Sequence, residues 1–299
     1  TAVLRNMLYA GSRTLADLGF VVMDEVHYLA DRFRGAVWEE VIIHLPESVA
    51  VVALSATVSN AEEFGEWLRT VRGETHVVVE EHRPVPLWQH VMAGDRLYDL
   101  FVDDAHDRVN PTLLRLARDD DRLARVRRDY RRGASPRPAR GGARPRSTQV
   151  PRRPEVVERL ARDRLLPAIY FVFSRVGCAA AVDQCLAAGL RLTSTEEREQ
   201  ITSIVERRTA NMPAEDLLVL GYADWVDGLR RGFAAHHAGM LPAFKETVEE
   251  LFQLGLVKCV FATETLALGI NMPARTVVLE KLVKWNGETH AEVTPGEYT

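Results

Sequence analysis

Two adjacent carboxylates, Asp24 and Glu25, stand at the end of an apolar run and have the chemistry of a phosphate-processing site. The run 20–24 is typical of a buried strand in a parallel sheet. Ligands of such sheets bind at the carboxyl ends of strands, so both acids are expected at a ligand site. One could hold a phosphate-bound Mg²⁺ through water, while the other activates the attacking water. A solvated acidic turn is the alternative, and the residues 24–27 alone leave both open.

A second polar turn follows the next apolar run, 49–54, and consists of Ser55, Ala56 and Thr57. Its hydroxyls could bond the carboxylate site or cap a helix predicted over 59–72. Taken alone, the tripeptide favours the cap. Its place soon after Asp24 in the same predicted lobe adds weight to the first interpretation.

Three further turns in the second half of the chain join an apolar run to a helical pattern. They are 173–175, 236–240 and 262–273, and each is polar or contains glycine. We expect all three at one edge of a parallel sheet. Hydroxyls, backbone amides and helix N-termini there suit contacts to a phosphate backbone. The alternatives are a structural histidine pair at 236–237 and a helix cap at 263–265.

Strand patterns alternate with helical patterns through most of the chain, which predicts an α/β fold with parallel sheets and helices on both faces. The 299 residues suffice for two domains. Predicted strands are 20–24, 49–54, 77–79, 85–92, 168–173, 232–235, 257–262 and 275–280. Predicted helices are 59–72, 155–166, 177–187, 195–209, 214–230 and 242–254.

Basic charge is concentrated in one segment, 122–153, which carries twelve arginines, no lysine and one acid. The net charge of −4 argues, by itself, against a nucleic-acid binder, but this distribution argues for one. Residues 119–153 are rich in Arg, Pro, Gly and Ser, with little to bury, so we predict a disordered insertion or linker there.

Other functional classes have little support in the sequence. The three cysteines, Cys178, Cys185 and Cys259, give neither a disulfide framework nor the close pair spacing of a zinc site, and are expected to be buried in a reducing cytoplasm. No apolar run has the length of a membrane span, and no secretory signal is seen, so no membrane partner is expected.

Five segments occur in the order of known helicase motifs: DEVH, SAT, FSR, HHAGM and ATETLALGINMP. Together they resemble motifs II to V of superfamily 2 DExH-box helicases. The last two resemble the superkiller-type branch, which includes exosome-associated RNA helicases. The run DEVHYLADRFRGAVWEEVIIHLP is most similar to actinobacterial HelY-type RNA helicases. The resemblance covers nearly the whole chain except the Arg-rich insertion, and implies two RecA-like parallel-sheet lobes that bind ATP and Mg²⁺ between them.

The resemblance implies catalytic roles in the first lobe. Asp24 would hold Mg²⁺ through water, Glu25 would activate the hydrolytic water, and His27 would complete the set. His27, Ser55 and Thr57 would couple the ATP state to strand separation.

The resemblance also implies binding roles. Gly269 and Asn271 would face the nucleotide, together with Asp24 and Glu25. The positions expected to contact a nucleic-acid strand are Thr1, Arg5, Ser174, Arg175, His237, Gly239 and Thr263.

Two elements of the helicase pattern are not found in the sequence. No G-x-x-x-x-G-K-[ST] phosphate loop occurs, and the chain stops where relatives run on into the arginine-finger motif. The expectation is a chain truncated at both ends and inactive by itself. It comprises 1–92, the C-terminal part of the first RecA-like lobe; 93–153, a linker with the insertion; and 154–299, a second lobe lacking its last motif.

The sequence thus predicts the core of an ATP-dependent RNA helicase in the cytoplasm, with RNA favoured over DNA and an RNA-degradation complex as a candidate partner. A DNA helicase of the same superfamily is the alternative. A non-catalytic RNA-binding scaffold is the second alternative, and the intact Asp24 and Glu25 speak against it.

Overall fold

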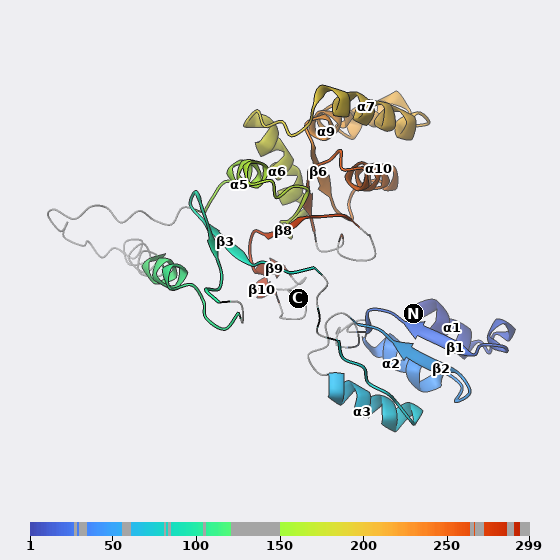
Figure 1. The fold of residues 1–299 in the computed structure, drawn as a ribbon. Coiled ribbons are helices and arrows are strands. Elements are labelled where there is room, and N and C mark those ends of the chain that lie inside the picture. Colours follow the sequence, from blue (N-terminus) through green and yellow to red (C-terminus); the bar gives the residue numbers. More distant parts are fainter. Residues whose placement is uncertain are drawn as a thin grey trace, which may run out of the picture. The chain divides into compact units, whose positions relative to one another are not determined.

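The computed structural model describes most of the chain, in two units (Figure 1). The first unit comprises Thr1–Pro86 with a short piece from Glu292, and the second comprises Leu87–Ala291. The described residues are 1–26, 29, 35–55, 61–80, 82, 85–103, 106–120, 150–263, 266, 272–285 and 290–293. Four predicted site residues lie outside these ranges: His27, Thr57, Gly269 and Asn271.

The first unit contains two parallel strands, β1 (Phe20–Met23) and β2 (Ala50–Ala53), paired from Phe20↔Ala50 to Met23↔Ala53. Its helices are α1 (Ala2–Tyr9), the 3₁₀ turn Arg13–Leu15, α2 (Gly35–His44) and α3 (Ala61–Arg72).

The core of the first unit lies on one face of these strands. Val21 and Met23 are buried there with Val41 and Ile42 of α2. The alternate residues of β1 point the other way, and Phe20 is 72% exposed. The prediction of strands at 20–24 and 49–54 is confirmed, but β1 is buried on one face only and β2 is only partly buried on one face. Helix α2 was not predicted, because its apolar residues do not follow a single helical stripe.

The second unit is built on a four-stranded parallel sheet with strand order β6-β7-β5-β8. Its strands are β5 (Ala168–Phe171), β6 (Phe233–His236), β7 (Cys259–Ala262) and β8 (Thr276–Leu279). Its helices are α5 (Arg153–Arg162), α6 (Arg175–Ala187), α7 (Thr195–Thr209), α8 (Ala214–Val219), α9 (Tyr222–Arg230) and α10 (Pro242–Gln253).

Helices cover both faces of this sheet, α5 and α6 on one and α7, α9 and α10 on the other (Figure 1). Strand β7 shows why its sequence is a continuous apolar run. Cys259 and Phe261 enter the core beneath α5 and α6, whereas Val260 and Ala262 enter the core beneath α10. All four side chains are fully buried. The predicted α/β class with parallel sheets is confirmed.

Regular secondary structure continues beyond residue 92, where the sequence predicted a linker. Strands β3 (His90–Ala93) and β4 (Arg96–Asp99) form an antiparallel hairpin, and a helix follows at 111–120. Arg159 of α5 donates to the carbonyl of Asp95, and Met92 packs against the α5–α6 core, so the hairpin belongs to the second unit. The predicted strand at 85–92 is therefore wrong in extent, because the strand observed there is β3, from His90 to Ala93.

Two other predicted elements differ from the structure. No strand forms at 77–79, where Val78 is 89% exposed. The helix predicted over 214–230 is two helices, because Gly221 adopts a left-handed conformation (φ 66°) between α8 and α9. A further strand pair, β9 (Val283–Trp285) with β10 (His290–Glu292), was not predicted.

Arg153, the last arginine of the basic segment, is a structural residue of the second unit. Its guanidinium makes a bidentate pair with Glu280, at 3.0 and 3.2 Å, and donates to the carbonyl of Gly177. Both partners are largely buried, so this pair ties α5 to the end of β8 and the first turn of α6. The predicted linker 93–153 thus includes residues that belong to the folded sheet unit.

The three cysteines are free and buried, as predicted. Burial raises the pKa of Cys178 to about 11 and that of Cys185 to about 12, which makes both thiols poor nucleophiles. Within the described residues, no helix is long and apolar enough to cross a bilayer.

Candidate functional site

Asp24 and Glu25 lie in the turn that leaves β1, and both are exposed. The amide of Glu25 donates to Oδ1 of Asp24 at 2.9 Å, and the amide of Val26 donates to the carbonyl of Leu54 at 2.9 Å. The turn is thereby fixed to the end of β2. Glu25 has a φ of 57°, which is uncommon for a residue with a Cβ and stores backbone strain. The sequence places its two adjacent carboxylates in a constrained, solvent-facing turn.

This turn fits Mg²⁺ bound together with phosphates. Mg²⁺ keeps several waters and takes only one or two carboxylates from the protein when it binds nucleotide phosphates. The described residues hold no group of three or more His, Cys, Asp or Glu side chains that could cage a metal by themselves. A water-mediated site on Asp24, completed by phosphate oxygens, needs no such cage.

The other predicted residues of the first unit lie on different elements. Ser55 is the second residue after β2 and is partly buried, next to Leu54, which holds the β1 turn. Thr1 precedes α1 as its N-cap residue but makes no side-chain cap bond. Arg5, on α1, lies 3.6 Å from Glu40 of α2. The structure therefore brings Ser55 to the carboxylate turn, and gives Arg5 a partner within its own unit.

In the second unit, the predicted contact residues gather at the carboxyl ends of three neighbouring strands. Ser174 and Arg175 follow β5, His237 and Gly239 follow β6, and Thr263 follows β7. Since β6, β7 and β5 are consecutive in the sheet, these turns lie side by side.

Arg175 occupies the first position of helix α6, and its side chain is exposed. A cation at a helix N-terminus is disfavoured by the helix dipole unless an anion binds there. Ser174 is the N-cap, and its hydroxyl oxygen accepts from the amide of Gly177 at 3.1 Å. Phe173, just before it, has a φ of 55°. This end of α6 is a strained turn that presents a cation and a positive helix end.

His237 and Gly239 lie against Arg175. The amide of Gly239 donates to Nδ1 of His237 at 3.2 Å, so the neutral imidazole carries its proton on Nε2. A Cβ on Gly239 would come within 3.3 Å of His237 and 3.6 Å of Arg175. Burial, then Arg175 and His236, lower the pKa of His237, which keeps it neutral at neutral pH. The group thus combines a permanent cation with a neutral hydrogen-bond donor.

His236 was not singled out from the sequence, where the two histidines form one polar pair. The structure separates them, because His236 is the last residue of β6 and only 1% exposed. Its carbonyl accepts from the amide of Thr263 at 3.3 Å. The alternation of strand residues could have predicted this: two residues before His236, Ala234 also points into the sheet core.

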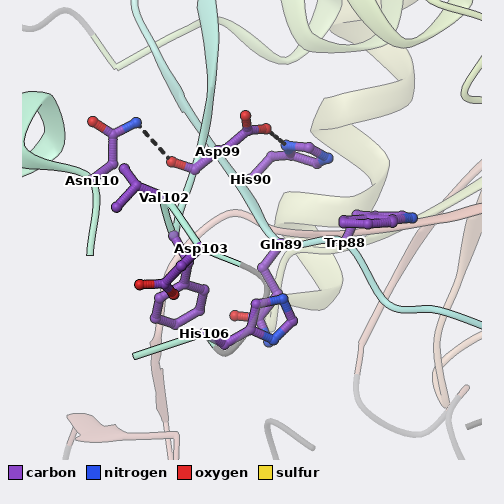
Figure 2. Close-up of a pocket in the computed structure, with 9 residues that line it drawn as sticks. Trp88, Gln89, His90, Asp99, Val102, Asp103, His106 and Asn110 are labelled. Carbon is purple, nitrogen blue, oxygen red and sulfur yellow. Dashed lines mark hydrogen bonds and ion pairs between the residues drawn. The ribbon is translucent and has the colours of Figure 1, made fainter. Parts of the chain in front are cut away.

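A separate hollow of about 410 Å³ lies beside the β3–β4 hairpin (Figure 2). His90 pairs with Asp99 at 2.9 Å, and Asn110 donates to the carbonyl of Asp99. Asp103 accepts from Arg108 at 2.8 Å, and this contact holds the pKa of its carboxyl below the usual value. None of the predicted site residues lines this hollow. Its polar groups bond one another, which indicates a role in holding the hairpin to the following loop.

Comparison with known proteins identifies the family. The family model for DEAD/DEAH box helicases matches residues 1–64. The chain is 62% identical, over its whole length, to Probable helicase HelY of Mycobacterium tuberculosis. It is 40% identical over 99% of its length to the DExH-box ATP-dependent RNA helicase DExH15 chloroplastic of Arabidopsis thaliana, and 35% identical over its whole length to exosome RNA helicase MTR4 of Homo sapiens.

The chain carries a DEAD/DEAH-box helicase domain. It is homologous to the MTR4- and superkiller-type DExH helicases, so the family resemblance of the motifs is confirmed. Its two α/β units with parallel sheets agree with RecA-like helicase lobes. The chain spans about a third of the length of these relatives, 33% of HelY, 27% of DExH15 and 28% of MTR4.

Proposed function

We propose that the full-length protein is an ATP-dependent RNA helicase that couples hydrolysis, assisted by Mg²⁺, to unwinding or translocation. The observation that carries the proposal is the pair of strand-end sites. Exposed carboxylates follow β1 in one unit, and an arginine, a histidine and a glycine converge after β5 and β6 in the other. The first suits hydrolysis of a nucleoside triphosphate, and the second suits phosphates of a nucleic-acid strand.

Within this proposal, Asp24 carries Mg²⁺ through water and Glu25 is the general base. Ser55, with His27 and Thr57, links the nucleotide site to strand separation, and Gly269 and Asn271 face the nucleotide. The strand runs over Ser174, Arg175, His237, Gly239 and Thr263 of the second lobe and over Thr1 and Arg5 of the first.

The sequence predicts a first RecA-like lobe within 1–92, a linker at 93–153 and a second lobe from 154. The contacts of the hairpin at 90–99 favour a boundary near Pro86, where the two units divide. We also propose a cytoplasmic protein whose hydrolysis needs parts of the full-length molecule beyond these 299 residues, because a G-x-x-x-x-G-K-[ST] loop is not found among them.

RNA is favoured as the substrate because DExH15 and MTR4 are named as RNA helicases. MTR4 is named for the exosome, which supports an RNA-degradation complex as the partner. A DNA helicase is the alternative, since the name of the HelY protein, at 62% identity, specifies neither nucleic acid. The exposed Asp24 and Glu25 speak against a non-catalytic scaffold.

The test is hydrolysis of ATP by the full-length protein with Mg²⁺ and matched single strands of RNA or DNA. We expect RNA to stimulate turnover and duplexes with an RNA overhang to be unwound. Stimulation by DNA alone would establish the alternative, and no stimulation by either strand would contradict the helicase function.

A further inference from the structure

A buried hydrogen bond lies directly behind the contact residues of the second unit. Nε2 of His236 is 2.7 Å from Oε1 of Glu249, which lies on α10. A carboxylate accepts, so Nε2 of the imidazole carries the donated hydrogen. His236 is 1% exposed and the Glu249 side chain 22% exposed, so the bond is largely shielded from water. It fixes the last residue of β6 to the helix that follows the contact turn.

His236 also connects to both neighbouring contact turns through its backbone. Its carbonyl accepts from the amide of Thr263, at the end of β7. Its next residue, His237, begins the turn in which the amide of Met240 bonds the His237 carbonyl at 3.1 Å. A shift of His236 would therefore move His237 and Thr263 together.

A polar side chain at the buried position of His236 lowers the stability of the folded state. Nδ1 is fully buried and has no hydrogen-bond partner in the described part of the chain. A buried polar atom without a partner lowers stability, and an aliphatic side chain would pack there without that cost. The bond to Glu249 offsets part of the cost. Stability by itself therefore does not explain why this pair is present. A need to fix the direction in which the chain leaves β6 does explain it.

We propose that the His236–Glu249 hydrogen bond positions the turn at 237–240 and the amide of Thr263 for binding of a nucleic-acid strand. Both are positioning residues that act through His237 and Thr263. The inference rests on the proposed function, because it specifies how the same strand-contacting surface is held.

The test uses the full-length protein and a single-stranded RNA whose binding is followed by fluorescence anisotropy. Glu249→Ala removes the acceptor and should weaken RNA affinity roughly tenfold, the size expected for loss of a buried hydrogen bond. Glu249→Gln keeps an oxygen that accepts from Nε2 and should retain affinity within about twofold on the same scale. The RNA concentration for half-maximal ATPase should follow these affinities, while turnover at saturating RNA stays near wild type.

The chain offers a matched control in the next residue of α10. Glu250 is as buried as Glu249, with 24% of its side chain exposed, but it pairs with Arg207 and Arg208 of α7. Glu250→Ala should leave RNA affinity unchanged, although it also breaks ion pairs. An equal loss in Glu250→Ala and Glu249→Ala would reduce the effect to general destabilisation and overturn the proposal.

A second variant separates positioning from folding. In His236→Leu/Glu249→Leu, both polar groups are replaced together, which is often neutral for stability. Thermal stability should return toward wild type while RNA affinity stays low. Recovery of both, or wild-type affinity in Glu249→Ala, would overturn the inference and leave the proposed function intact. Failure of the wild-type protein to bind RNA would remove the proposed function itself, whereas failure of Arg175→Ala to weaken binding would remove Arg175 from the proposed interface.

Discussion

The two strand-end sites are built alike, but they present opposite chemistry. Each follows a parallel strand, and each contains a residue with a Cβ in the left-handed region, Glu25 in one and Phe173 in the other. The turn after β1 presents two carboxylates, whereas the turn after β5 presents Arg175 at the N-terminus of α6. The same local geometry therefore presents an acidic turn in one unit and a basic turn in the other, as the two proposed binding sites require.

The two sites also differ in how far apart their residues lie in the sequence. Asp24 and Glu25 are neighbours in sequence, and a single turn fixed to Leu54 holds them. Arg175, His237 and Thr263 come from three separate turns that only the strand order β6-β7-β5 brings together. We infer that the first site depends on one turn, and that the second depends on the packing of the sheet. Four substitutions test this contrast, from the largest expected effect to the smallest.

Glu25→Gln in the full-length protein tests the first site. It preserves size and hydrogen bonding but removes the basic carboxylate, so turnover of ATP should fall on the order of 10²-fold or more. Binding of ATP and of RNA should persist. Steady-state ATPase measurements give the turnover, and a parallel nucleotide-binding assay gives the affinity for ATP. Wild-type turnover in Glu25→Gln would mean that Glu25 belongs to a solvated turn without a catalytic role.

Gly177→Ala tests the dependence of the second site on packing. An added Cβ would lie 2.7 Å from Cγ1 of Val172 and 3.0 Å from Cβ of Ser174, so the Val172 side chain or the N-terminal turn of α6 must shift. Overpacking of this kind costs about 1–3 kcal/mol. Chemical denaturation should show that loss in Gly177→Ala. The control Gly239→Ala meets its neighbours only at 3.3 Å or more and should lose less; equal losses would contradict the packing argument.

Arg175→Ala tests the cation of the second site. Each phosphate neutralised on a single strand contributes roughly −0.7 to the slope of log affinity against log salt, so the slope should flatten by about that amount. Arg175→Lys should keep the slope. Exposed Arg191, beyond the C-terminal end of α6, provides the control, and Arg191→Ala should change nothing. Identical salt slopes for Arg175→Ala and wild type would remove Arg175 from the interface.

His237 should give the smallest effect, through pH. Its pKa is lowered in the folded chain by burial, Arg175 and His236, while the unfolded chain titrates near the ordinary value of 6.5. The unfolded state therefore binds the proton more readily. The contribution of His237 to stability is complete above pH 6.5 and is lost as pH falls toward the folded pKa. The melting temperatures of wild type and His237→Gln, plotted against pH, should converge or cross as the pH falls below neutral. A difference in melting temperature that stays constant with pH would contradict the lowered pKa of His237.

The sequence predicted the second unit well because most residues of β5, β6 and β7 are buried. The run 259–262 is apolar at every position, and the alternating helices mark a parallel sheet. The hairpin at 90–99 was missed because its strands are only partly buried, so their apolar pattern is weak. Strand 77–79 was predicted from β-branched residues alone, and propensity does not supply a pairing partner.

The candidate site was predictable to the same degree. The residue types at the strand ends predicted the two carboxylates and Arg175. The expected parallel topology predicted that the turns share one edge of the sheet. The positive φ of Phe173 and the burial of His236 could not be predicted, because both arise from tertiary packing behind the turns. The structural use of Arg153 was hidden for the same reason, since its partner Glu280 lies far along the chain.

The central proposal is that, in the full-length protein, the carboxylate turn after β1 serves ATP hydrolysis and the turns after β5, β6 and β7 hold the strand. It is tested most directly by titrating RNA into the ATPase reaction of full-length wild type, Glu25→Gln and Arg175→Ala. We predict that Glu25→Gln lowers maximal turnover with its directly measured RNA affinity unchanged, and that Arg175→Ala raises the half-maximal RNA concentration with maximal turnover unchanged. If both substitutions lowered only maximal turnover, or both shifted only the RNA concentration, the division of labour between the two sites would be contradicted.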